Sequence, residues 1–210
     1  MDTGKNSTRE KILLHLCCAP CSPHPINLLE KDFDITLFFY NPNIHPESEY
    51  VDRLEEVKKL AKIKKLPLIE DEYRPDLWME KLGPFEDEPE KGKRCRMCIE
   101  DRLGRAAKKA AHIGINNFGT VLSVSPHKDA VMINAAGRRV QGKKANCGEE
   151  VVEAAEVNFY ASDFKKKEGF KISSRIAKEL GFKRQDYCGC VFSIRKGKTG
   201  AKAGPAQVEN

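Results

Sequence analysis

Long apolar runs are absent from this sequence of 210 residues. No stretch approaches the roughly 20 consecutive apolar residues that a membrane-spanning helix needs, so we expect no membrane partner. The first segment, Met1 to Arg9, lacks the apolar core of a secretory signal, and no internal repeat is visible. We therefore expect a cytoplasmic, reducing environment, where clustered cysteines are more often metal ligands or redox groups than disulfides.

The remaining composition is that of an ordinary globular protein, with 40% hydrophobic and 32% charged residues. A chain of this length favours one domain with a sizeable core, which we expect to span residues 1–195. Lys196 to Asn210 is rich in Gly, Lys and Ala, so we expect a disordered basic tail there. The net charge of +6 is compatible with a nucleic-acid partner but does not establish one.

Short apolar runs alternate with amphipathic stretches, which predicts an α/β fold with a parallel sheet of about five strands and right-handed crossovers. The predicted strands are Lys11–Cys17, Asp34–Tyr40, Leu66–Glu70, Asn117–Ser125 and Val157–Ala161. The predicted helices are His24–Lys31, Glu47–Lys65, a short one opening at Tyr73–Trp78, Arg94 to about His112, about Asp129 to Arg138, and one capped by Ser173 or Ser174 and running to Leu180 before Gly181. Gly83–Lys93 is predicted to be a loop and Gly142–Gly148 a linker.

Cysteine is concentrated in a few places. Seven of the eight cysteines fall into three clusters, which are Cys17, Cys18 and Cys21, then Cys95 and Cys98, and finally Cys188 and Cys190. A pair three residues apart on a helix and a Cys-Gly-Cys turn each direct two sulfurs to one side. Thiolates select zinc, copper(I) or iron–sulfur clusters. Because a structural zinc and a cubane cluster each take four ligands, seven thiols predict a cluster with a second group beside it.

Three other interpretations of the cysteines stay open. A structural zinc would stabilise an RNA-binding protein without chemistry of its own. The thiols could be buried as small apolar side chains, although their clustering argues against this. Cys18-Ala19-Pro20-Cys21 resembles the thioredoxin dithiol, so Cys18 and Cys21 could serve a thiol–disulfide oxidoreductase, which leaves five clustered cysteines unexplained. Cys147 stands alone in the predicted linker and is assigned no role.

Several motifs together resemble the QueH family of epoxyqueuosine reductases, the cobalamin-independent enzymes of tRNA queuosine biosynthesis. The matching pieces are Leu14–Pro20, Phe39–Ile44, Arg94–Cys98, Ser125–Lys128, Phe164–Lys166 and Arg184–Ser193. The resemblance implies a Rossmann-like fold of the adenine-nucleotide α-hydrolase type. It also implies a [4Fe–4S] cluster beside a second mononuclear iron, with the seven clustered cysteines as metal ligands. The activity implied is removal of the epoxide oxygen from epoxyqueuosine at the wobble position of tRNA, giving queuosine, with electrons from an external low-potential donor.

One departure from the family pattern concerns the second iron. Some relatives have an acidic residue at the position of Cys21, and sulfur in place of oxygen makes a softer metal site. The identity and the potential of the second metal therefore stay open. The resemblance also leaves open which sulfurs hold the cluster and which hold the lone iron.

Reduction of an epoxide to an alkene needs a proton donor, and the candidates are Lys128, Tyr187 and His127, each beside a predicted strand end or cysteine turn. His127 and Lys128 could equally be surface residues ahead of the next helix, and Tyr187 could simply pack beside the cluster. Tyr40 and Asn41 are candidates for substrate binding because they end the second strand beside the first, although Asn41-Pro42-Asn43 could be only a turn.

Four basic stretches could contact tRNA phosphates, and binding would then weaken with salt. They are Lys108–Lys109, Arg138–Arg139, Lys143–Lys144 and Lys165–Lys167. A solvated surface is the alternative for all of them. It is the favoured interpretation for Lys58–Lys59 and Lys64–Lys65.

Overall fold

The protein is described by a computed structural model that defines residues 9–141, 146–147, 150–151 and 157–194. The predicted α/β architecture is confirmed. A five-stranded sheet has the order β3-β2-β1-β4-β7, and every neighbouring pair in it is parallel. Its strands are β1 (Glu10–His15), β2 (Phe33–Phe39), β3 (Leu68–Glu70), β4 (Asn117–Thr120) and β7 (Asn158–Phe159).

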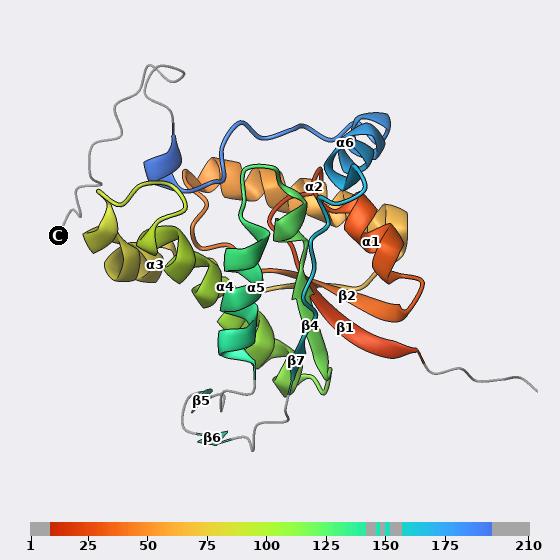
Figure 1. The fold of residues 1–210 in the computed structure, drawn as a ribbon, viewed down its shortest axis with the longest axis horizontal. Coiled ribbons are helices and arrows are strands. Elements are labelled where there is room, and N and C mark those ends of the chain that lie inside the picture. The colour runs from red at the N-terminus through yellow and green to blue at the C-terminus, as the bar shows by residue number, and fades with distance from the viewer. Residues whose placement is uncertain (1–8, 142–145, 148–149, 152–156, 195–210) are drawn as a thin grey trace, which may run out of the picture.

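Helices cover both faces of this sheet (Figure 1). They are α1 (Pro23–Leu29), α2 (Glu47–Lys64), α3 (Pro75–Leu82), α4 (Lys93–His112), α5 (Ala130–Val140) and α6 (Gly169–Glu179). One core contains α1 and α2 side chains, and the other contains those of α4 and α5. No helix in the described part of the chain is long and apolar enough to cross a membrane.

Strand β1 lies in the middle of the sheet and contributes to both cores, because successive side chains point to opposite faces. Ile12 and Leu14 belong to the core beneath α1 and α2, whereas Leu13 belongs to the core beneath α4 and α5. All three are fully buried. A strand buried on both faces has a continuous apolar sequence, as observed here.

Two sequence predictions are wrong. The predicted strand Asn117–Ser125 ends at Thr120 and continues as a 3-10 helix, Val121–Val124, in which the Thr120 hydroxyl accepts a hydrogen bond from the Leu122 amide. Ser173 and Ser174 are not caps, because α6 begins at Gly169 and both serines lie inside it. The hydroxyl of Ser173 is buried, accepts from the His24 amide at 3.3 Å and donates to the Cys21 carbonyl at 3.2 Å, so it joins α6 to the first cysteine loop.

Other boundaries differ by a few residues. The predicted loop Gly83–Lys93 contains a 3-10 turn at Gly83–Phe85, and the last cysteine segment ends in another at Val191–Ser193. In the predicted linker, β5 (Asn146–Cys147) pairs with β6 (Glu150–Val151) in an antiparallel ladder. The rest of that linker and the predicted tail at 196–210 lie outside the described residues.

Candidate active site

The first cysteine cluster lies directly beyond the carboxyl end of β1. This strand is flanked by β2 on one side and β4 on the other, and ligands of open α/β sheets bind where the strand order reverses in this way. Cys17 and Cys18 are buried, and the Cys17 thiol donates to the Cys18 sulfur at 4.0 Å. The Ser22 hydroxyl donates to the Cys18 carbonyl at 2.8 Å and fixes the turn into α1.

Buried polar side chains hold the backbone that leads into this loop. The ring of His15 is completely buried, with Nδ1 at 3.0 Å from the Thr120 hydroxyl and Nε2 at 3.2 Å from the Tyr40 carbonyl. Burial, assisted by the charge of Arg102, lowers the pKa of His15 to about 3, so the ring is neutral. The Asn41 amide donates to the Leu16 carbonyl at 2.9 Å. Asn41 is buried and therefore has a structural role beside the predicted substrate-binding one.

The middle cluster divides between two environments. Cys98 is buried in a small apolar cluster with Trp78, Leu82 and Cys190. Cys95 is half-buried in the first turn of α4, where its sulfur accepts from the Lys91 amide at 3.3 Å. The structure therefore brings Cys98, from the middle of the chain, together with Cys190 from its last described turn.

The Cys188-Gly189-Cys190 turn is held from both sides. The Gly189 carbonyl accepts from the His45 amide at 2.8 Å, and the Ser193 hydroxyl donates to the Cys190 carbonyl at 2.7 Å. The same hydroxyl lies 3.1 Å from the Cys188 sulfur. The thiol of Cys190 donates to the Cys188 sulfur, and this contact holds the pKa of Cys188 well below its ordinary value.

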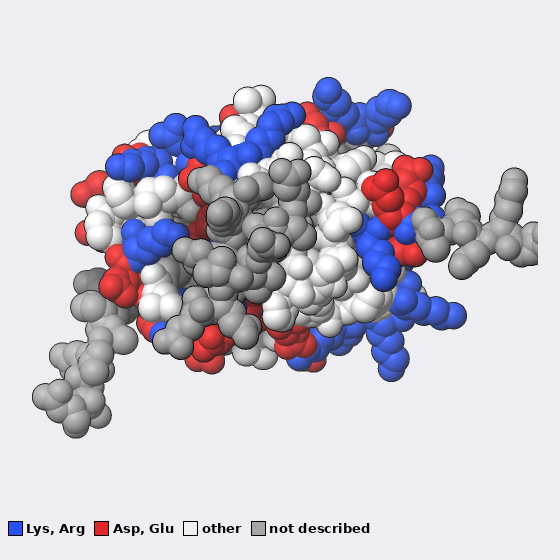
Figure 2. Space-filling view, turned by 90° about the horizontal axis from the view of Figure 1, so that it is seen from below, with Lys and Arg blue, Asp and Glu red and all other residues white. Residues whose placement is uncertain are grey.

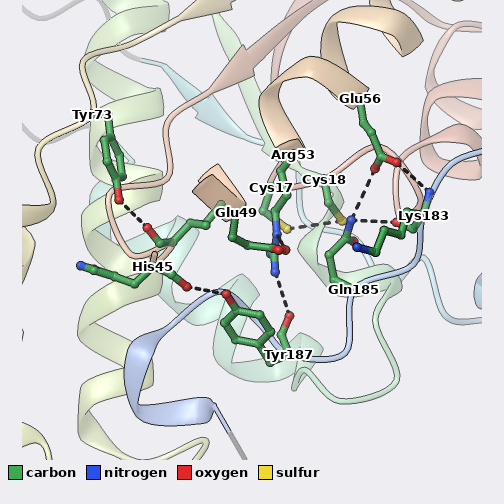
Figure 3. Close-up of polar contacts among 11 residues, drawn as sticks. Cys17, Cys18, His45, Glu49, Arg53, Glu56, Tyr73, Lys183, Gln185 and Tyr187 are labelled. Atoms are coloured by element: carbon green, nitrogen blue, oxygen red, sulfur yellow. Dashed lines mark hydrogen bonds and ion pairs between the residues drawn. The ribbon is translucent and has the colours of Figure 1, made fainter. Parts of the chain in front are cut away.

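Arg53 connects this turn to the first cysteine loop (Figure 3). Its guanidinium donates to the Glu49 carboxylate at 2.7 Å and to the Tyr187 carbonyl at 3.1 Å, and it lies 5.3 Å from the centre of the Tyr187 ring. Burial opposes the charged form of Arg53, but Cys17, Cys18 and Glu49 outweigh it, and the net change in the pKa of Arg53 is upward.

Two cations face thiols from all three clusters. Burial lowers the pKa of the Arg102 guanidinium, but the thiols of Cys98, Cys17 and Cys188 counteract this and the net change is upward. Lys128 favours the thiolate form of the same three sulfurs, although the hydrogen bond to Cys18 and burial raise the pKa of Cys17, and burial raises that of Cys98. Arg102 and Lys128 therefore each influence one member of every predicted cluster.

The chemistry of these groups fits a metal–thiolate centre. The seven cysteines of the clusters are all free of disulfides, and their neighbours are cationic. The buried indole Nε1 of Trp78 has no partner within ordinary hydrogen-bond limits, and the Cys98 sulfur is the acceptor beside it. Within the described ranges, however, no group of three or more His, Cys, Asp or Glu side chains is already arranged as a metal cage.

The predicted proton donors occupy different settings. Lys128 is half-buried and acts on the three sulfurs named above. His127 is exposed, and its backbone amide donates to the Ser125 hydroxyl oxygen at 3.3 Å. The Tyr187 hydroxyl donates to the His45 carbonyl, which gives it a positioning role. Tyr40 is half-buried beside the Arg105 guanidinium, and burial raises its pKa to about 12.

A cleft of about 710 Å³ opens between α2 and the segment that precedes the last cysteine turn. Its lining includes Glu49, Asp52, Arg53, Lys183 and Tyr187. Because Arg53 also faces Cys17 and Cys18, the cleft adjoins the thiol region from outside.

Sequence reasoning missed Arg53, Arg102 and Trp78. A signal existed for Arg102, which lies four residues after Cys98 and therefore on the same face of α4. Arg53 and Trp78 lie far from any cysteine in the sequence, so no local pattern identifies them.

The fold and the site define a class, which is an α/β protein with a buried, thiol-rich site at the carboxyl edge of a parallel sheet. Residues 12–196 match the family model described as Epoxyqueuosine reductase QueH. The chain thus belongs to the QueH family of epoxyqueuosine reductases, which are oxidoreductases.

Individual relatives agree with this assignment, and each is named epoxyqueuosine reductase QueH. The relative from Streptococcus pyogenes serotype M1 is 36% identical over 197 residues, covering 91% of this chain and 73% of its own length. The relative from Acinetobacter baylyi is 38% identical, and the match covers 89% of this chain and 81% of the relative. The relative from Thermotoga maritima is also 38% identical, and the match covers 87% of this chain and 90% of the relative.

Proposed function

We propose that this protein reduces epoxyqueuosine to queuosine at the wobble position of tRNA, in the cytoplasm, with a [4Fe–4S] cluster and a second iron. The observation that carries the proposal is the packing of Cys98 against Cys190 and Cys188, in a chain that belongs to the QueH family. An external low-potential donor supplies the electrons.

The seven clustered cysteines are the residues that would hold the metal centre. They come from the loop after β1, the first turns of α4 and the turn before Val191. When bound, such a centre supplies single electrons, and an iron with an open position acts as a Lewis acid on oxygen. Seven sulfurs leave room for both groups, since a cubane cluster takes four.

The protein's own residues must deliver protons. Converting an epoxide to an alkene consumes two electrons and two protons and releases water. Lys128 is the best-supported donor, because its half-buried amine lies close enough to the last cysteine turn to influence the Cys188 thiol. Tyr187 fits a positioning role better, since its hydroxyl is already donated to the His45 carbonyl.

The cleft beside Arg53 offers a route for the modified base. A wobble nucleotide lies in a single-stranded loop, and such bases can be turned out and bound in a pocket. Tyr40 lies near enough to Cys98 to be influenced by it, and its ring could stack on the base. Exposed lysines outside the cleft would bind the phosphates.

Metal analysis with turnover tests the proposal. Protein purified without oxygen should be brown, contain iron and sulfide, and reduce epoxyqueuosine in tRNA. Colourless zinc protein would support the RNA-binding alternative, and metal-free protein with an easily oxidised Cys18–Cys21 pair would support the dithiol alternative. Either result contradicts the proposal.

Replacing Lys128 tests its assignment as donor. Lys128→Met should lower turnover by about 100-fold or more, which is the usual contribution of a positioned acid, with iron and sulfide content unchanged. Lys58→Met is the matched control, because Lys58 is occupied in ion pairs with Glu55 and Glu70 on the surface. Unchanged turnover in Lys128→Met removes Lys128 from the mechanism.

A further inference from the structure

Arg102 is a buried cation without a carboxylate partner. Only 3% of the Arg102 residue is exposed to solvent. Its Nε donates to the Cys98 carbonyl at 3.3 Å and its Nη1 to the Asn41 amide oxygen at 3.5 Å. Both acceptors are neutral, and no ion pair joins Arg102 to any carboxylate in the described part of the chain.

The other buried arginines are compensated differently. Arg53 is 2% exposed and forms an ion pair of 2.7 Å with Glu49. Arg94 is also 2% exposed, but it donates to two backbone carbonyls and lies 4.8 Å from the centre of the Phe192 ring. Burying a charge is costly unless a group of opposite charge faces it. Among the described residues, Arg102 has neither the ion pair of Arg53 nor the aromatic ring that faces Arg94, so its charge requires another negative partner.

The groups around Arg102 indicate what that partner is. Cys98 lies one helical turn before it on α4. Asn41 joins it to the Leu16 carbonyl, immediately before Cys17. Cys98, Cys17 and Cys188 lie close enough that their thiolate forms would raise the pKa of its guanidinium. Thiols become anionic when they bind a metal.

We propose that Arg102 is the internal counter-ion of the metal–thiolate centre, a positioning residue that neutralises part of the centre's negative charge. The inference rests on the proposed function. Metal-bound thiolates give an iron–sulfur centre a net negative charge, and each added electron increases it. A fixed positive charge nearby stabilises the reduced form more than the oxidised form. Arg102 then makes the centre easier to reduce and slows the loss of its metal.

Three variants of the metal-loaded protein separate charge from hydrogen bonding. Arg102→Gln keeps donors for the Cys98 carbonyl and Asn41 but removes the charge, whereas Arg102→Lys keeps the charge. Arg139→Met removes one positive charge from the surface, where Arg139 pairs with Glu100. The readouts are the reduction potential of the centre, followed by electron paramagnetic resonance, and the rate of iron loss to a chelator.

Arg102→Gln should shift the potential to more negative values and accelerate iron loss by about 10-fold or more, the usual effect of removing a group that supports metal ligands. Arg102→Lys should keep the reduction potential and the rate of iron loss close to those of wild type. Arg139→Met should change neither the potential nor the rate. A potential in Arg102→Gln that matches Arg139→Met overturns the counter-ion role alone. Wild-type protein without iron and sulfide overturns the proposed function itself, and the counter-ion role with it. If Arg102→Gln does not fold, a potential in Arg102→Lys equal to that of wild type supports the role, and loss of the centre in Arg102→Lys overturns it.

Discussion

Gly189 separates the last two cysteines, and its backbone determines how they are presented. Its φ is +98°, a conformation that side-chain-bearing residues rarely adopt. A Cβ atom at this position would lie 2.8 Å from Cγ1 of Ile44 and 3.3 Å from a guanidinium nitrogen of Arg53. The Cys-Gly-Cys spacing therefore requires glycine for both backbone and steric reasons.

Replacing Gly189 should disturb the metal centre as well as the fold. We expect Gly189→Ala to lower the iron and sulfide content markedly, because the turn must move away from Ile44 and carry Cys188 and Cys190 with it. The matched control is Gly181→Ala, where φ is +74° but no atom lies within 4 Å of the new Cβ. This control should cost about 1–2 kcal/mol of stability and leave metal content unchanged. Equal metal content in the two variants would contradict the expectation.

The grouping of the cysteines into three candidate ligand clusters is visible in the sequence, because clustering and spacing are local properties. Only the first cluster follows the carboxyl end of a strand, which is where the rule for parallel sheets places ligands. The role of Ser173 was misjudged, since a serine before an amphipathic run has the same local pattern whether it caps a helix or lies buried inside one. Its true partners, His24 and Cys21, are about 150 residues away in the sequence. Such long-range contacts leave no local signal.

At the scale of elements, α4 and α5 lie against each other on one face of the sheet (Figure 1). Each helix contains a glycine. A methyl group on Gly137 of α5 would overlap the ring of Phe159 in β7. A methyl group on Gly104 of α4 would meet only Cγ1 of Val140, at an ordinary contact distance of 3.7 Å. One glycine is thus required by packing and the other is not.

These two glycines should respond to alanine with opposite signs. Gly137→Ala should lower stability by about 1–3 kcal/mol, because the ring of Phe159 must shift within a filled core. Gly104→Ala should raise stability by about 0.5–1 kcal/mol, since alanine favours the helix and finds space. Thermal unfolding of the metal-loaded variants, measured side by side with wild type, checks both. A shift of the same sign in both would show that the packing argument is wrong.

Hydrophobic pattern was sufficient to predict five parallel strands and the helices between them, because β1 and β2 each contain a short apolar run and α2 and α4 are long. It was not sufficient to place the end of β4. The sequence from Val121 to Val124 is apolar and resembles a strand, but there it forms a buried 3-10 turn. A short apolar segment is equally compatible with a strand and with a buried 3-10 turn, and its tertiary environment decides which one forms.

At the scale of the whole molecule, the lysines and arginines of the described residues do not form one continuous basic face on the side seen in Figure 2. Lysine and arginine side chains lie mainly along the edges of that face, with acidic groups between them. Several predicted phosphate-binding residues are already engaged. Lys165 donates to the Lys128 carbonyl at 2.7 Å, and Arg139 pairs with Glu100 at 2.6 Å. RNA contact is therefore expected from a few exposed lysines.

Lys166 and Lys167 are both exposed and follow the anchored Lys165, so they are the best candidates for phosphate contact. If each contacts one phosphate, replacing both with alanine should weaken tRNA binding and reduce the slope of log affinity against log salt by about 2, because each contact releases about one counter-ion. Lys58→Ala is the control, since its ion pairs with Glu55 and Glu70 leave it committed to the protein surface, and its slope should equal that of wild type. Filter binding across a salt series gives both slopes. An unchanged slope in the Lys166 and Lys167 double variant would show that these lysines belong to a solvated surface, and that the electrostatic contact with tRNA lies elsewhere on the molecule.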